Sequence, residues 1–560
     1  MSAADTTHRW SRWDTVALCA IGIVLVLPLV GLLRYQGPPM EEGFMLVFPE
    51  RILRGAYPHR DFLHLYGPGS LWLLAGVYKV FGVHLTVERL VGFLQHAAVG
   101  YGLFFLLRPW GRRIATSAAI VAVVVLIGPL GLSAMAWNGA LAFSVWGLVV
   151  GVWAGWAPDA TRGRRLALLS GLLVACALLY RPDMVIAAGA GAAALAFGMT
   201  SERRRRFAVG VTAGLLLYVP HLWLAGPSAA FRGMFLEPVF ELRGGRSLPI
   251  PPSWSQTDGF LQRAGELRLT GWPLPMLAPS KQIALWFFLV LASCVLIVMT
   301  AWRVRRIEPA TRRSQSYWPA ALFGAALVQQ ALQRPDTAHL SWVSGITFPL
   351  SMVAVSWIVA RWRPRWDDGR AQLLGVGAVV VVLAGVIPFY PARTYVDLVG
   401  QSFGRNRFGA PIRNDGRTFY FGSASGAADA QRVVDALDRA ARPGQSLVVG
   451  PTDLSRTNYS DAYFYYLFPK LRPGTRYIEM DPGLADSATS ALPRELERVD
   501  WLVLSAAWDD WSEPNDSANG RSQRANRVVE RNFCLVVRTP TYSLFRRYSD
   551  GTSCPPAAIP

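Results

Sequence analysis

Charged residues are scarce in this chain: Asp, Glu, Lys and Arg make up 17% of its 560 residues, whereas an ordinary soluble domain carries about 25%. The deficit lies in the first 390 residues, where long apolar runs alternate with short polar segments. Hydrophobic residues reach 52% of the whole chain. This composition excludes an ordinary water-soluble enzyme over most of the length and indicates an integral membrane protein, with the lipid bilayer as its first partner.

Acidic residues are the scarcer charged kind, with 37 Asp and Glu against 56 Lys and Arg, so the formal net charge is +19. In a soluble protein, such an excess would indicate nucleic-acid binding. Here the basic residues form short clusters between apolar runs, which is how a membrane protein marks its cytoplasmic loops. We therefore expect no nucleic-acid partner.

Cysteine is rare as well: the chain has five, and none shows C-x-x-C or another metal-ligating spacing. Cys19, Cys176 and Cys294 lie inside apolar runs, where a thiol behaves as a small hydrophobic group. Cys534 and Cys554 lie in the polar C-terminal part, and they can form a disulfide if that part faces an oxidising compartment.

The apolar runs are long, and most approach the roughly 17 to 25 residues that about 30 Å of hydrocarbon requires. The first run follows basic residues, as in a secretory signal, but it is too long for one and no small-residue cleavage site follows it. We predict about eleven spanning helices, over residues 16–33, 90–107, 114–132, 140–156, 166–179, 184–199, 207–224, 283–301, 318–332, 340–360 and 373–389.

The fifth and sixth of these runs are short, so one long helix competes with a helical hairpin. Arginine clusters at 162–165 and 203–206 flank the pair. A hairpin keeps both clusters on one side of the membrane, whereas a single crossing would separate them. The charge pattern therefore favours the hairpin.

A cytoplasmic N-terminus would place every dense arginine cluster in the cytoplasm. The segments 34–89 and 225–282, three short turns and the tail then face outward. Loops of this length usually carry binding or catalytic groups, so we expect the function on the outer face of a multi-pass cell-membrane protein. Residues 70–81 are apolar but too short to span, and we expect them at the membrane interface. The arginine clusters lie at 9–12, 108–113, 162–165, 203–206, 303–313 and 361–370.

The segment directly after the first apolar run is rich in ionisable groups, which are costly so near hydrocarbon and mark a candidate site. A carboxylate here can deprotonate an acceptor hydroxyl, and the separation of Glu42 and Asp61 allows them to face each other across a turn. The alternative is a set of interfacial helices with solvated charges. The candidate residues are Glu41, Glu42, His59, Arg60, Asp61, His64 and Tyr66.

The triplet Arg-Pro-Asp occurs at two of the outside turns, at 181–183 and at 334–336, each at the end of an apolar run. In a purely structural role, proline ends the helix and aspartate caps the next one beside a local ion pair. In a functional role, an arginine presents its guanidinium to a lipid phosphate, whose oxygens it can bind in pairs. The candidate residues are Arg181, Asp183, Arg334, Asp336 and His339.

A metal site is the remaining chemistry to consider, because His59, Asp61 and His64 alternate closely. Their spacing matches no established zinc pattern. We predict no metal site and no cofactor, with a divalent cation left open.

The chain after residue 390 is polar and spaced by Pro and Gly, which predicts a separate soluble domain at 391–560, after a transmembrane domain at 1–390. Residues 427–441 have helical spacing, so the domain is expected to be a small α/β unit. Acceptor binding or complex assembly is its expected role. Four short apolar runs predict strands at 446–449, 501–504, 533–537 and 542–545.

An acidic pair beyond the first apolar run precedes a G-x-x-P-x-x-D-F stretch at 55–62 and the run YGPGSLWLLAGVYKVFG at 66–82. Together these motifs resemble the GT-C superfamily of integral membrane glycosyltransferases, in particular its bacterial ArnT/PMT-like family. The resemblance covers about the first 110 residues well and the rest mainly by topology. It implies a helical bundle, an extended first outer loop and often a soluble C-terminal domain.

The same resemblance implies transfer of a sugar from a polyprenyl phosphate to a glycan, lipid or protein acceptor of the cell envelope. Acidic residues of the first outer loop would hold the base or bind the acceptor, which here implies Glu41, Glu42 and Asp61. Many members have Asp before Glu at the acidic pair, and this chain has two glutamates, so the identity of the base stays open. Arginine would hold the charge of the departing lipid phosphate.

Two other functions compete with this one. A transporter or lipid-linked saccharide flippase would also need buried charges, and the twin Arg-Pro-Asp triplets are the one hint of a repeat. Their place at the outer ends of helices favours an interfacial site instead. A non-enzymatic scaffold would use the tail to bind envelope components.

Overall fold

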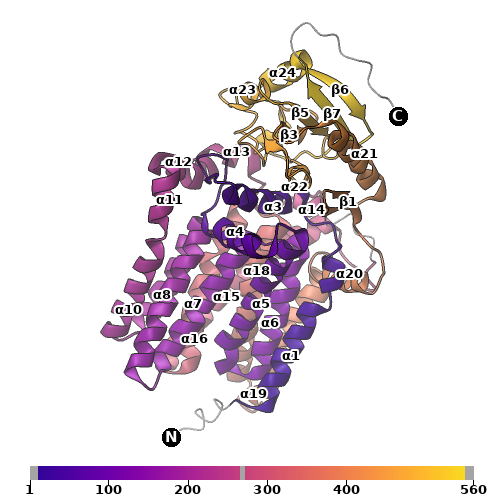
Figure 1. Ribbon diagram of the computed structural model, residues 1–560. Helices are drawn as coiled ribbons and strands as arrows, with labels where there is room; N and C mark the ends of the chain where they lie inside the picture. The colour runs from indigo at the N-terminus through magenta and orange to yellow at the C-terminus, as the bar shows by residue number, and fades with distance from the viewer. Residues whose placement is uncertain (1–9, 265–270, 549–560) are drawn as a thin grey trace.

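The computed structural model describes residues 10–264 and 271–548 as a helical bundle with a smaller domain beyond one end (Figure 1). The short helices α3 (Pro39–Leu53) and α4 (Gly69–Phe81) lie between the two parts (Figure 1). Two residues singled out in the sequence, Arg9 and Cys554, fall outside the described residues. The disulfide between Cys534 and Cys554 therefore stays a prediction.

Nine helices in the described residues are long and apolar enough to cross a membrane. This confirms the expected fold class, a helical membrane domain followed by a small α/β domain. The nine are α1–α2 (Arg12–Leu32), α5–η2 (Leu85–Trp110), α6 (Arg112–Leu130), α7 (Ala136–Trp156), α8 (Ala160–Tyr180), α10–α11 (Ser201–Ala225), α15 (Pro279–Ile307), α18 (Thr337–Trp362) and α19–η6 (Asp368–Val386).

The other two predicted runs are also helical, but each falls short of a complete span for a physical reason. The helix η3–α9 (Pro182–Phe197) is apolar but short. The helices α16 (Arg312–Ala326) and α17 (Val328–Gln333) begin with two arginines and carry polar side chains at both ends. The prediction of about eleven spanning helices is therefore too high by two: all eleven runs are helical, but in the described residues nine meet the requirements of a span.

The two short apolar runs in the middle of the chain form a hairpin, as their flanking charges predict. The N-cap residue Asp159 starts α8, and Pro182 follows its end. The chain returns as α9 (Val185–Phe197), and Arg203 beyond it donates to the carbonyl of Gly155 at 2.9 Å, close to the start of α8. Both arginine clusters therefore lie at one end of the bundle.

The other dense arginine clusters lie at the same end, away from the C-terminal domain. Arg108 pairs with Asp14 at 2.6 Å, near the start of α1. Arg313 donates to the carbonyl of Pro109 at 3.3 Å and lies 3.4 Å from Asp368. Clusters that are far apart in sequence therefore meet at a single end, which is what the positive-inside rule requires of them.

The C-terminal domain contains a five-stranded sheet with strand order β4-β3-β5-β7-β6. Strand β3 is parallel to β4 and β5, whereas β7 is antiparallel to β5 and β6. The four predicted strands and the predicted helix are all present. The elements are β3 (Ser446–Pro451), β4 (Arg472–Pro473), β5 (Trp501–Ser505), β6 (Phe533–Arg538), β7 (Tyr542–Arg547), α21 (Ala424–Ala440), α23 (Leu492–Leu496) and α24 (Arg524–Asn532).

Several short elements connect the bundle to this domain. The predicted domain boundary at residue 390 falls between η6 and the amphipathic helix α20 (Ala392–Ser402). The antiparallel pair of β1 (Ala410–Asn414) and β2 (Arg417–Phe421) follows. The remaining short elements are α12 (Pro227–Phe231), the π-helix η4 (Arg232–Glu241), α13 (Arg243–Arg246), α14 (Phe260–Ala264), α22 (Tyr463–Leu467) and η7 (Asp516–Ala518).

We predict that the arginine-rich end is cytoplasmic and that the C-terminal domain lies outside. A reporter enzyme that is active only outside the cytoplasm should be active when fused to the C-terminus. The same reporter fused after Gly111, in the loop between α5 and α6, should be inactive. The reverse pattern, with both fusions stable on immunoblots, would contradict the predicted orientation.

Candidate functional site

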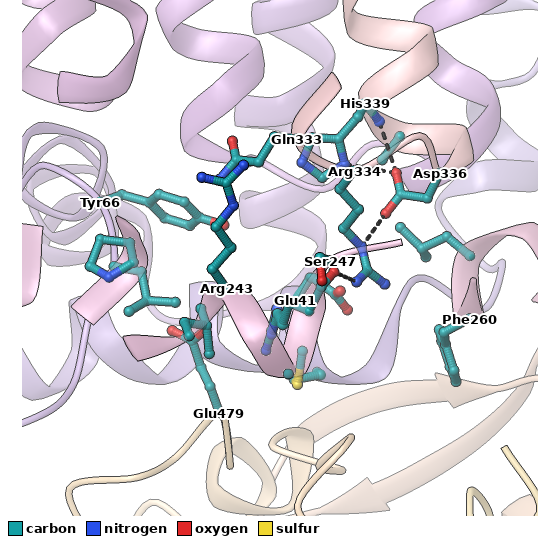
Figure 2. A pocket seen from close by; sticks show the side chains of 18 of the residues that line it. Glu41, Tyr66, Arg243, Ser247, Phe260, Gln333, Arg334, Asp336, His339 and Glu479 are labelled. Atoms are coloured by element: carbon teal, nitrogen blue, oxygen red, sulfur yellow. Dashed lines mark hydrogen bonds and ion pairs between the residues drawn. The ribbon is translucent and has the colours of Figure 1, made fainter. Parts of the chain in front are cut away.

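A cleft lies between the end of the bundle and the C-terminal domain, where α3, α13 and the α17–α18 turn face loops of that domain (Figure 2). It holds about 1450 Å³ of free space, part of which is open to solvent. Apolar side chains alternate with four arginines and five carboxylates along its walls, which suits an amphipathic ligand. The charged residues are Arg181, Arg243, Arg246, Arg334, Glu41, Asp183, Asp336, Glu479 and Glu513.

Seven of the twelve candidate residues line this cleft: Glu41, Tyr66, Arg181, Asp183, Arg334, Asp336 and His339. They come from three segments that are far apart in sequence, the first outer loop and the two Arg-Pro-Asp turns. The structure leaves the other five, Glu42, His59, Arg60, Asp61 and His64, outside the lining of the cleft.

The two Arg-Pro-Asp turns meet at the cleft. Arg181 pairs with Asp183 at 2.6 Å, and Arg334 pairs with Asp336 at 2.7 Å. The side chain of Gln330, just before the second turn, donates to Asp183 at 3.0 Å and so joins the turns. Both triplets therefore have the structural role of local ion pairs, and both also face the cleft.

Asp336 has the capping role as well, because its carboxylate accepts a hydrogen bond from the backbone N–H of His339 at 3.0 Å at the start of α18. The imidazole of His339 lies 2.8 Å from the same carboxylate (Figure 2). Arg334 also donates to Glu513 of the C-terminal domain and to the carbonyl of Arg246. Its guanidinium is thus occupied by the protein itself.

Glu41 lies in the first turn of α3, which starts at Pro39. The hydroxyl of Tyr459, a residue of the C-terminal domain, donates to its carboxylate at 2.9 Å. Burial raises the pKa of Glu41 above its ordinary value of 4.5. A carboxylate with a raised pKa that faces a cleft is a better proton acceptor than an exposed one.

Glu42, the next residue, points the other way into the protein. Both of its carboxylate oxygens accept hydrogen bonds from Arg89 at 2.7 Å, and the two side chains are 1% and 2% exposed. The third donor of Arg89 reaches the carbonyl of Leu32 at 2.7 Å. The geometry makes Glu42 a buried structural partner, so the open choice within the acidic pair now favours Glu41 as the candidate base.

Asp61 does not face Glu42 as the sequence suggested. It pairs with its neighbour Arg60 at 2.8 Å and accepts a hydrogen bond from the backbone N–H of Tyr57 at 2.7 Å. Its side chain is 32% exposed. The carboxylate of Asp61 therefore has its hydrogen-bond and ion-pair partners within its own loop.

The two candidate histidines are buried beside Tyr66 rather than in the cleft. His59 lies 2.9 Å from the ring of His221, and its other nitrogen lies 3.1 Å from the carbonyl oxygen of Tyr66. Burial lowers the pKa of His59 to about 3, so its imidazole is neutral at physiological pH. His64 packs edge-on against the ring of Tyr66.

Tyr66 connects these histidines to the cleft. The guanidinium of Arg181 lies over its ring, 4.2 Å from the centroid, and is also 4.9 Å from the ring of Trp137. This stacking, together with the pair to Asp183, fixes Arg181 in one orientation. His59 and His64 thus position a cleft residue without lining the cleft themselves.

Five charged or aromatic cleft residues do not stand out in the sequence: Arg243, Arg246, Tyr459, Glu479 and Glu513. The first two belong to the long second outer loop, which the length argument does single out as a functional segment. The other three come from the C-terminal domain. No spacing in the sequence connects them to the acidic pair, since the contact depends on how the domain sits on the bundle.

Arg243 differs from the other arginines of the cleft. Arg181, Arg246 and Arg334 each pair with a carboxylate. Within residues 10–264 and 271–548, Arg243 forms no ion pair, and it is exposed. Its side chain extends from α13 into the cleft (Figure 2). Among the described residues, its guanidinium is therefore the one in the cleft with free charge for an anionic ligand.

Glu479 adds a second carboxylate of special character. It is 2% exposed, lines the cleft, and its Oε1 atom has no hydrogen-bond partner in the described part of the chain. Burial and the neighbouring charge of Asp481 raise its pKa well above the ordinary value. A neutral Glu479 can donate a hydrogen bond to a ligand oxygen.

A metal centre is not among the arrangements seen. In the residues that the structure describes, no group of three or more His, Cys, Asp and Glu side chains is placed to hold a metal ion. Asp61, one member of the His-Asp-His pattern, is paired with Arg60.

Comparison with solved structures identifies the fold. ArnT from Cupriavidus metallidurans, bound to undecaprenyl phosphate, matches over 96% of this chain and 99% of its own, with a TM-score of 0.52 and 14% identity. The archaeal oligosaccharyltransferase AglB from Archaeoglobus fulgidus, in complex with an inhibitory peptide and a dolichol-phosphate, matches over 97% of this chain and 75% of its own. Its TM-score is 0.52 and its identity 12%. The chain has the GT-C fold.

The likeness to the GT-C fold extends over nearly the whole chain, including the C-terminal domain. It confirms the fold that the resemblance of the motifs at 55–62 and 66–82 implies. No protein-family model and no curated protein matches the sequence. The function must therefore be argued from the residues of the cleft.

We predict that Glu42 acts on stability. Replacing Glu42 with Gln leaves Arg89 buried without its counter-charge, which costs on the order of 3 to 5 kcal/mol of unfolding free energy. The melting temperature of the purified protein in detergent should fall clearly. Arg89→Gln should lower the unfolding free energy less in the Glu42→Gln variant than in the wild type, because the ion pair is already lost in the variant.

Asp61→Asn serves as the matched control for this prediction. The pair of Asp61 with Arg60 is partly exposed and screened by water, so its loss should leave the melting temperature nearly unchanged. An equal fall for Asp61→Asn and Glu42→Gln would show that burial does not distinguish the two carboxylates.

Proposed function

We propose that this protein is a membrane glycosyltransferase that moves a sugar from a polyprenyl phosphate to a hydroxyl of a cell-envelope acceptor, on the outer face of the membrane. One observation carries the proposal: the carboxylate of Glu41 and the free guanidinium of Arg243 line the same cleft at the end of the bundle. The GT-C fold supports it, since ArnT is bound to undecaprenyl phosphate and AglB to dolichol-phosphate.

The donor phosphate is assigned to Arg243. A guanidinium matches phosphate oxygens in a bidentate manner, and this one is not occupied by a carboxylate of the described residues. Arg181, Arg246 and Arg334 surround it with positive charge that is already paired. The cleft can therefore hold one phosphate group without an excess of uncompensated charge.

The polyprenyl chain is assigned to the apolar wall of the cleft. Met234, Pro238 and Val239 line this wall from the π-helix η4. On the same helix, Phe235 and Phe240 are 46% and 64% exposed. The helix thus carries apolar side chains on both its cleft side and its outer side, between the exposed pair of Arg232 and Glu241 at its ends, and these side chains can lead a lipid toward the cleft.

The acceptor hydroxyl is assigned to Glu41. Its carboxylate accepts the hydroxyl proton while the hydroxyl oxygen forms a bond to the anomeric carbon of the donor sugar. The bond between that carbon and the phosphate oxygen breaks, and its electron pair leaves with the polyprenyl phosphate, held by Arg243. Phosphate is a good leaving group, so the reaction needs no second carboxylate as an acid, unlike glycoside hydrolysis.

The acceptor itself is assigned to the side of the cleft formed by the C-terminal domain. Tyr459 of this domain contacts Glu41, and Phe260 of α14 stacks on its ring at 4.2 Å. Trp508 and Trp511 of the domain pack against Phe260 and enlarge this aromatic cluster. Aromatic faces next to polar side chains suit sugars and peptides. A glycan, a lipid-linked or a protein acceptor would each present such a group to this surface.

We predict that Glu41→Gln lowers the transfer rate about 100-fold or more, because the proton acceptor is lost. The donor can be taken from the lipid fraction that accumulates in cells lacking the protein. Transfer by the purified variant is then measured against the wild type. Glu497→Gln, an identical change at an exposed site of the C-terminal domain, should keep the wild-type rate, and full activity of Glu41→Gln would rule out Glu41 as the base.

The dependence of this rate on pH follows from the raised pKa of Glu41. The base works when deprotonated, so the rate should be full well above that pKa and should fall as the pH drops through it. Because burial raises the pKa, the acidic limb should lie above pH 4.5. An acidic limb at or below pH 4.5 would contradict the raised pKa.

We predict that Arg243→Gln weakens binding of undecaprenyl phosphate by about tenfold or more, through loss of a charge-assisted contact. The dissociation constant is measured on purified protein in detergent. Arg243→Lys should recover part of the affinity, and Arg439→Gln, at an exposed site on α21, should keep all of it. Unchanged affinity in Arg243→Gln would place the phosphate elsewhere.

In the cell, the decisive experiment is mass analysis of lipid-linked sugars and envelope glycans with and without the protein. A transferase predicts that the donor accumulates and that one sugar disappears from the envelope. Both changes should be reversed by wild-type protein and not by Glu41→Gln. A flippase predicts that Glu41→Gln restores the envelope as well as the wild type does.

A further inference from the structure

A second cavity, with about 1140 Å³ of free space, part of which is open to solvent, lies where α2 (Leu29–Leu32), α20 and the β1–β2 pair meet. It shares no lining residue with the catalytic cleft. In Figure 1, α20 and β1 lie at the same end of the bundle as the C-terminal domain. This cavity therefore belongs to a different side of the same membrane-proximal layer.

Three arginines line the second cavity: Arg34, Arg407 and Arg413. All three are exposed, and within the described residues none of them forms an ion pair. Among the described residues, the lining contains no aspartate or glutamate. Three unpaired guanidinium groups around one cavity repel each other, so the arrangement favours an anionic occupant.

The walls of the cavity are fixed by backbone contacts. The N–H of Gly31 donates to the hydroxyl of Ser402 at 2.8 Å, which joins α2 to α20. The N–H of Gln36 donates to the carbonyl of Phe408 at 2.8 Å. A Cβ at Gly31 would lie 2.7 Å from the carbonyl oxygen of Leu398, so the two helices pack as closely as a glycine permits.

Apolar side chains lead from the membrane-spanning part of the chain to this cavity. On α1, Ile23 and Val26 are 59% and 54% exposed, and Val30, which lines the cavity, is 55% exposed. Phe403, at the end of α20, is 72% exposed. In a membrane, an exposed apolar stripe of this kind faces lipid chains.

The charge pattern of the whole chain makes these arginines unusual. The dense arginine clusters of the bundle lie at its other end, where Arg313 contacts the carbonyl of Pro109, next to Arg108, and Arg203 contacts the carbonyl of Gly155. At the end that carries the C-terminal domain, Arg181, Arg246 and Arg334 of the cleft each pair with a carboxylate. The three arginines of the second cavity form no ion pair within the described residues. A specific anionic ligand would neutralise the charge of these three guanidinium groups.

We propose that the cavity of Arg34, Arg407 and Arg413 binds the headgroup of an anionic phospholipid, whose acyl chains lie along the exposed face of α1. The phosphate is held by two or three guanidinium groups, and the chains cover Ile23, Val26 and Val30. The lipid would fix α20 and the β1–β2 pair, which connect the bundle to the C-terminal domain. This binding does not depend on the transfer reaction proposed above.

The test is native mass spectrometry of the full chain in dodecyl maltoside with added dioleoylphosphatidylglycerol or dioleoylphosphatidylcholine. The proposal predicts retained phosphatidylglycerol adducts and few phosphatidylcholine adducts. The triple variant Arg34→Gln, Arg407→Gln, Arg413→Gln should bind phosphatidylglycerol at least about tenfold more weakly. The variant Arg439→Gln, Arg498→Gln, Arg531→Gln removes the same charge from exposed sites elsewhere and should bind like the wild type.

Two further measurements complete the test. Arg243→Gln should keep the adducts, since the catalytic cleft is a separate site, and Arg407→Gln alone should weaken binding in the same direction as the triple variant. Equal binding of both lipids, wild-type binding by the triple variant, or an equal loss in the control triple would overturn the proposal. Displacement of the lipid by an equal concentration of inorganic phosphate would overturn it too, in favour of a site for free phosphate.

Discussion

The buried ion pair between Glu42 and Arg89 is the interaction on which the candidate site depends. It ties the first turn of α3 to α5 and, through the carbonyl of Leu32, to the end of α2. Successive residues of a helix point about 100° apart, so with Glu42 held inward, Glu41 faces the cleft. The two carboxylates of the acidic pair thus differ in environment: Glu42 holds the helix in place, and Glu41 lines the cleft as the candidate base.

The arginines of the cleft also differ in whether a carboxylate pairs with them. Buried charge is tolerated where it is matched, and Arg181 and Arg334 are matched by the aspartates two residues later in the chain. Arg243 has no ion-pair partner in the part of the chain that the structure describes, and it faces the cleft. A nearly neutral cleft with one free cation among the described residues is able to hold a single phosphate group and release it afterwards, which a cluster of unpaired arginines would hinder.

Sequence patterns were sufficient for features that depend on neighbouring residues. Hydropathy located the helices, charge located the arginine-rich end, and alternation located the strands of the C-terminal domain. The choice between Glu41 and Glu42 was beyond reach, because it depends on Arg89, 47 residues away along the chain. Tyr459 and Glu479 were also beyond reach, since they enter the cleft only through the docking of one domain on another.

The central claim is that one cleft holds the lipid phosphate at Arg243 within reach of a base at Glu41. A structure of the full chain in complex with undecaprenyl phosphate tests it most directly. The account predicts that the phosphate lies within hydrogen-bond distance of the Arg243 guanidinium, with the lipid chain along η4 and open space beside Glu41. A phosphate bound away from this cleft, with Arg243 uncontacted, would contradict it.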